Sequence, residues 1–190
     1  MRPHARSVAA SRGSAYRKRT ASAFFTALRG RIESLGVLTE ASGIAGNNAN
    51  AVLPADGFSG FAAIDDYAPL VFVNTNAAME ARTFELMREF AHVLRGEPGI
   101  SGGEAGGDDR CSRFALEILL PSDDLPRAVT SIEDAEAIAQ SHFVDCKAVL
   151  LSARRHGAID EAQFGRLWEE ASKHPEAEGK ASRSRAAKAI

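Results

Sequence analysis

A long helical pattern from about Ala77 to Arg95 constrains the fold of this chain more than any other segment. Its apolar residues recur at the three- and four-residue spacing of one helix face, and Gly96 followed by Pro98 marks a helix end. The residues that we expect to face the core are Thr83, Leu86, Met87, Phe90 and Leu94.

Two β-rich runs come before this helix. The segments "FSGFAAID" and "PLVFVNT" flank "DYA" and predict a hairpin whose second strand is nearly all apolar. Upstream, "VLTEASG" is a candidate short strand, and the glycine-rich segment 96–109 predicts a mobile loop. The pattern predicts an α+β fold, with a small antiparallel sheet packed on the long helix.

Further helices are expected on both sides. Residues 20–36 place Phe24, Phe25, Leu28, Ile32 and Leu35 at helical spacing and end on Gly36, and "DRCSRFALEILLP" predicts another helix that stops before Pro121. Three short helices follow as a C-terminal end piece. Their start and stop signals are Ser131 with Asp134, Gly157, and Asp160 with Gln163.

The 190 residues, 45% apolar and 25% charged, indicate one globular domain with appendages. The formal net charge of −2 hides an asymmetry, because residues 1–20 contain six Lys or Arg and no acid. We expect a basic, disordered lead at 1–20, a core at 21–126, a helical region at 127–173 and a disordered basic tail at 174–190. The functional alternative is that these ends bind nucleic acid or an acidic partner through weak electrostatic attraction.

Several classes of protein are disfavoured. The chain has no apolar run near 18 residues, so neither a membrane span nor a secretory signal is expected, and a cytoplasmic protein is predicted. The first twenty residues also match the composition of an organellar transit peptide. Cys111 and Cys146, without any CxxC, argue against a cysteine zinc site and for a reducing compartment.

The segment "FELMREFAHVLRG", residues 84–96, has the outline of a zinc-peptidase helix. Zinc hydrolysis of a peptide bond needs two imidazoles one helical turn apart, a carboxylate beside them and a third ligand from elsewhere. The motif HExxH meets this need because residues i and i+4 share a helix face. Here Glu89 and His92 are in place, but Arg88 stands where the first histidine belongs. Alone, this spacing would fit any helix with a glutamate and a histidine.

The surrounding sequence resembles the ImmA/IrrE family of metallo-endopeptidases. The matching features are the hairpin with "DDYAPLVFVN", the helix with "EFAH" and the later helix with "RFALEILLP". The resemblance covers roughly residues 22–170, including "HGAIDEAQFGRLWEE". It implies a zincin-like core over 21–126 and regulation by cutting a partner, typically a helix-turn-helix transcriptional repressor.

The resemblance also implies site residues. His92 matches a zinc ligand, Glu89 the general base, and Asp108 the third ligand, with the neighbouring Asp109 as a substitute. The family uses zinc, but a guanidinium has no lone pair to offer a metal, so Arg88 leaves only two protein ligands. We hypothesise that Arg88 replaces the metal as a structural cation for Glu89, Asp108 and Asp109. A surface arginine without partners is the alternative.

A binding role is expected for the second hairpin strand. An extended peptide can add to a sheet edge, and the candidate residues are Val71, Phe72, Val73 and Asn74. Three functions remain open: a metallo-endopeptidase with an altered site, a pseudo-peptidase that binds its partner without cleavage, and a DNA-associated regulator. The last would act through the basic ends and the C-terminal helices, with Lys147, Arg154, Arg155 and His156.

Overall fold

The computed structural model of the chain describes residues 20–46, 48, 50–54, 57–101 and 110–173. Apart from residue 20, the basic lead and tail expected at 1–20 and 174–190 lie outside these residues. In chain order the elements are α2 (Ala21–Glu33), β1 (Leu38–Ser42), β2 (Gly60–Ala63), β3 (Leu70–Asn74), α3 (Met79–Arg95), β4 (Gly99–Ser101), α4 (Arg110–Leu119), the 3-10 turn η1 (Ser122–Asp124), α5 (Ile132–His142), α6 (Cys146–Arg155) and α7 (Glu161–Lys173).

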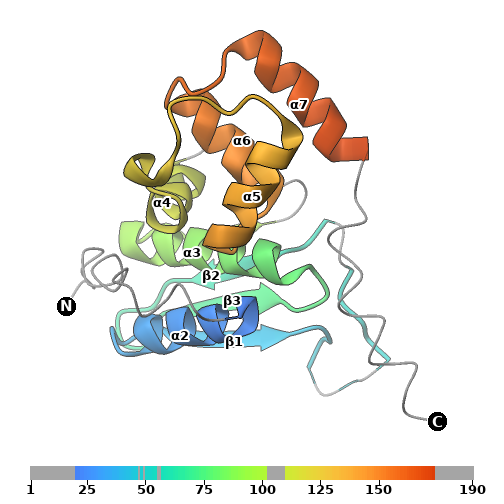
Figure 1. Cartoon of the computed structure of the whole chain (residues 1–190). Helices are drawn as coiled ribbons and strands as arrows, with labels where there is room; N and C mark the ends of the chain where they lie inside the picture. Colours follow the sequence, from blue (N-terminus) through green and yellow to red (C-terminus); the bar gives the residue numbers. More distant parts are fainter. Residues whose placement is uncertain (1–19, 47, 49, 55–56, 102–109, 174–190) are drawn as a thin grey trace.

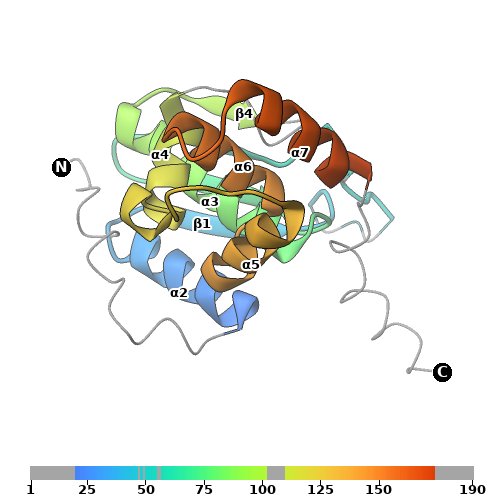
Figure 2. The ribbon, with the colours of Figure 1, turned by 45° about the horizontal axis from the view of Figure 1, so that its top comes forward.

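The molecule consists of a sheet, a middle layer of helices and a helical end piece (Figure 1). The strands lie in the order β1-β3-β2-β4. Helix α3 packs on β2 and β3, with α2 and α4 beside it, and α5, α6 and α7 lie farther from the sheet (Figure 2). Residues of the core and of the end piece belong to one buried cluster, from Phe25 in α2 to Leu167 in α7. No described helix is long and apolar enough to cross a membrane.

The α+β class is confirmed, and the sheet differs from the expectation in one pair of strands. The predicted hairpin forms, because β2 and β3 pair antiparallel with Phe61 opposite Phe72. Strand β1, however, runs parallel to β3. The sheet is therefore mixed. Two parallel strands need a long connection that brings the chain back to the same end of the sheet. The segment 43–69, which includes β2, provides this connection.

The segment 96–109 was expected to be a loop throughout, and this expectation was wrong for residues 99–101. They form β4, which pairs antiparallel with β2. Glycine and proline around a single apolar residue carry no strand signal, so the pairing depends on the neighbouring strand rather than on local propensity. Residues 102–109 lie outside the described part of the chain.

The expected helix boundaries agree with the structure. Gly36, Gly96 and Gly157 have positive φ at helix ends. Ser131 and Asp134 form a capping box at α5, and hydrogen bonds from the hydroxyl and amide of Thr130 hold the pKa of Asp134 below its usual value.

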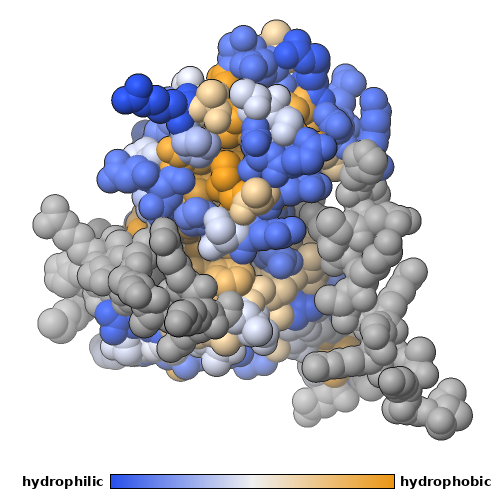
Figure 3. Space-filling model, in the orientation of Figure 1, coloured by the Kyte–Doolittle hydropathy of each residue, from blue (hydrophilic) through white to orange (hydrophobic). Residues whose placement is uncertain are grey.

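The space-filling view shows apolar patches among the hydrophilic residues of the helical side (Figure 3).

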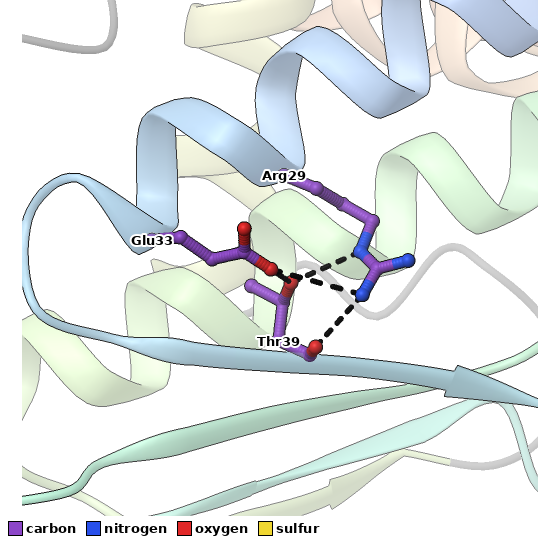
Figure 4. A network of polar contacts seen from close by, with 3 residues as sticks. All are labelled: Arg29, Glu33 and Thr39. Carbon is purple, nitrogen blue, oxygen red and sulfur yellow. Dashed lines mark hydrogen bonds and ion pairs between the residues drawn. The ribbon is translucent and has the colours of Figure 1, made fainter.

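Helix α2 closes one edge of the sheet. Leu38 N donates to Pro69 O, so the backbone of the next residue, Thr39, points away from β3. Arg29 Nη2 donates to the Thr39 carbonyl oxygen at 2.8 Å, and Nε donates to the Thr39 hydroxyl at 3.0 Å (Figure 4). The hydroxyl in turn donates to Glu33. An outward carbonyl of the edge strand β1 is thereby occupied, which blocks the addition of another strand there.

Candidate functional site

Helix α3 carries the motif residues against the sheet. Glu89 is fully buried, with 0% of its surface exposed, although it is an acid. It lies beneath β2 and β4: its Cγ is 3.4 Å from the Cβ that a side chain at Gly60 would have, and the Ser101 hydroxyl donates to its carboxylate. A buried carboxylate needs such donors, so the two strands and Glu89 form one packed unit.

His92 lies one turn farther along α3, against the first residue of β4. Its Nδ1 is 3.2 Å from the Glu97 carbonyl oxygen. That oxygen can only accept, so Nδ1 is the donor in this hydrogen bond. The ring also lies flat over Gly99, where a Cβ would be 2.8–2.9 Å from three ring atoms. The main chain after α3 therefore fixes the orientation and the position of the His92 ring.

Replacing Gly99 with alanine is expected to displace the His92 ring. Side-chain contacts below 3.0 Å are not tolerated, and the imidazole is the group that can move. NMR spectra of the histidine rings should show a shifted His92 resonance in Gly99→Ala and an unshifted one in Gly165→Ala, whose new methyl meets nothing within 4 Å. An unchanged His92 resonance in Gly99→Ala would contradict this packing.

Arg88 points to an acid that the sequence analysis did not consider. Its Nη1 is 3.3 Å from Glu85 Oε1, and the two side chains are 11% and 4% exposed. Arg88 Nε is buried and has no hydrogen-bond partner among the described residues. The surface-arginine alternative is therefore wrong, because Arg88 is only 11% exposed and forms an ion pair on its own helix. Asp108 and Asp109, its other expected partners, lie outside the described residues.

The described residues do not fit the zinc site that the resemblance implies. The first ligand position presents a guanidinium, which is a permanent cation without a lone pair. Nowhere in the described ranges are three or more His, Cys, Asp or Glu side chains grouped to hold a metal ion. Of the expected ligands, His92 alone can be placed, because Asp108 falls outside those ranges.

The expectation that residues 71–74 form a peptide-binding edge strand was wrong. They belong to β3, which has β1 on one side and β2 on the other, so its backbone groups are already paired. Val71 and Val73 are core residues, and Phe72 stacks on Phe61 with ring centroids 5.2 Å apart. Asn74 is buried and donates to the carbonyl oxygens of Pro54 and Phe58, a structural role.

The two thiols do not contribute to the site. Cys111 is buried in α4 and Cys146 is half-buried at the start of α6, and neither forms a disulfide. Burial, with Glu136 and Asp145 nearby, raises the pKa of Cys146 to about 12. Its nucleophilic thiolate is therefore scarce at neutral pH.

Comparison of the sequence with models of protein families gives a match that includes the motif helix. The family model of the M78 peptidases, described as the IrrE N-terminal-like domain, matches residues 53–153. This range contains β2, β3, α3, β4 and α4, and therefore Glu85, Arg88, Glu89 and His92. No curated protein and no solved structure matches the chain. Since the match covers more than half of the sequence, the chain belongs to the M78 peptidase family, with an IrrE N-terminal-like domain.

Proposed function

We propose that this chain is a non-cleaving member of the M78 peptidase family that regulates a protein partner by binding it. The observation that carries the proposal is the part-buried Arg88–Glu85 ion pair at the place of the first metal ligand. A peptidase of this type needs a metal to polarise the scissile carbonyl and to activate water. A cation fixed in the ligand position repels a metal ion. The protein therefore loses metal-dependent peptide hydrolysis and keeps the fold of the family.

The rest of the site supports binding rather than catalysis. A general base must reach the water that it deprotonates, whereas Glu89, with β4 in place, is fully buried and accepts a hydrogen bond from Ser101. The partner class remains the one that the family resemblance implies, a helix-turn-helix transcriptional repressor. Repression or its relief would then follow from occupancy of the complex, and the partner would stay intact.

Direct DNA reading is the less favoured function. Helix α6 would be the reading helix of the α5–α6 pair, but its middle residues are buried: Ala148, Val149, Leu150, Ser152 and Ala153. Arg155 and His156 contact Glu117 of α4, at 3.3 and 3.0 Å. Since Arg155 and His156 are engaged by Glu117, this end of α6 presents little free positive charge to a DNA groove. Apart from residue 20, the basic ends lie outside the described residues.

The test is zinc content, measured by elemental analysis on three purified proteins. We expect only traces in the unaltered chain and near-stoichiometric zinc in Arg88→His, which restores the family motif. Arg166→His adds an imidazole on the exposed side of α7 and should match the unaltered chain, which controls for nonspecific binding. Near-stoichiometric zinc in the unaltered chain would contradict the proposal and favour a metallo-endopeptidase instead.

A further inference from the structure

Strand β4 lies directly over the two motif residues that the chain retains. Its Ser101 hydroxyl donates to Glu89, and its Gly99 lies against the His92 ring. The strand pairs antiparallel with β2, with Gly60 opposite Ser101 and Ala62 opposite Gly99. The chain thus places its own extended segment on the strand that passes beside Glu89.

Very little side-chain burial holds β4 in this position. Of its three residues, all of them described, Ser101 alone is buried, and its side chain is polar. Gly99 has no side chain, and Ile100 is 84% exposed. Local opening costs least where few apolar groups are buried. Strand β4 therefore depends on its backbone pairing with β2 and on the Ser101–Glu89 hydrogen bond.

The backbone alternation shows which groups β4 covers. Asn74 N donates to Ser59 O, so Ser59 O and, two residues on, the backbone groups of Phe61 face β3, whereas Ser59 N donates to Ser101 O of β4. Gly60 and Ala62 must then face β4. If β4 left, the amides of Gly60 and Ala62 would be exposed at a sheet edge next to Glu89 and His92.

We propose that β4 is a displaceable strand, and that an extended segment of the protein partner takes its place on β2. This rests on the partner-binding function proposed above. The occupant has a defined chemistry, because β4 itself shows what the position accepts: a small residue over His92, an apolar residue on the open face of the sheet, and a hydroxyl that donates to Glu89.

The open face explains why the middle residue should be apolar. Ile100 lies opposite Phe61, which stacks on Phe72, and Phe58 stacks on Phe72 with centroids 6.0 Å apart. A large apolar side chain at the place of Ile100 continues this aromatic row. Addition at the other edge of the described sheet is disfavoured, because Arg29 occupies the outward carbonyl of Thr39 in β1.

The first test is amide hydrogen exchange by NMR on the unaltered protein. We expect Ala62 to exchange at least about tenfold faster than Phe61, although the two are neighbours, because only Ala62 depends on β4. Ser101→Ala should raise the Ala62 rate by roughly another tenfold and leave Phe61 unchanged, since it removes the hydrogen bond that joins β4 to Glu89. Equal rates for Ala62 and Phe61 in the unaltered protein would overturn the proposal.

The second test uses a synthetic peptide with the sequence of residues 96–101, GEPGIS. Added to Ser101→Ala, whose own strand is weakened, it should slow exchange at Gly60 and Ala62, while a peptide ending in Ala instead of Ser should slow it less. No slowing by GEPGIS would exclude replacement on β2. Neither test involves zinc, so displacement can fail while the non-cleaving function stands, and the zinc test can fail while displacement stands.

Discussion

Arg88→Met is expected to lower the free energy of unfolding by about 3 kcal/mol, because it removes the cation that pairs with the buried Glu85. Glu85, whose side chain is 4% exposed, would then lose the guanidinium that compensates its carboxylate. For a chain of this size, that loss lowers the melting temperature by roughly 6–12 °C. Differential scanning calorimetry or urea unfolding at neutral pH measures it.

Replacing Glu85, alone and together with Arg88, separates the free energy of the ion pair from the effect of each side chain. Glu85→Met alone should also destabilise the protein, since it leaves a buried guanidinium. Glu85→Met combined with Arg88→Met should recover most of the loss, because apolar side chains of similar volume often replace a buried ion pair without cost. The control is Lys173→Met, which breaks the exposed pair with Glu169 and should change stability by less than about 1 kcal/mol. An Arg88→Met effect as small as that of Lys173→Met would remove the structural-cation hypothesis.

The helices were predictable because their signals are local. A cap and a stop lie within a few residues of the helix end that they mark, as Ser131 with Asp134 and Gly96 do. The same is true of the hairpin, whose two strands are close in sequence. Periodicity also identified α3 and the place of Glu89 and His92 along it.

What the sequence could not show depends on distant contacts. Glu85 is polar, so periodicity assigns it to solvent, and its burial follows from packing that also encloses Arg88. The signal in the sequence was the i,i+3 spacing of Glu85 and Arg88, which places an acid and a base on one helix face. The interior position of β3 and the strand β4 depend on pairings between segments far apart in the chain, which residue preferences do not encode. Asp108 and Asp109 remain predictions.

The second large effect is expected for Gly60→Ala, at about 2–3 kcal/mol of destabilisation. A Cβ at this residue would be 2.5 Å from the backbone oxygen of Phe72, which cannot move without shifting β3. It would also be 3.4 Å from Glu89 Cγ. Alanine therefore forces β2 away from both the neighbouring strand and the motif helix. Chemical denaturation with circular dichroism detection measures the loss.

Gly165→Ala is the matched control, because the same methyl group is added at an open position within α7. Alanine is the better helix former, so this variant should gain about 0.5–1 kcal/mol. The two substitutions are chemically identical and should have opposite signs, which excludes a general effect of replacing glycine. If Gly60→Ala were as stable as the unaltered chain, β2 could not lie this close to Phe72 and Glu89, and the packing of the candidate site would need to be revised.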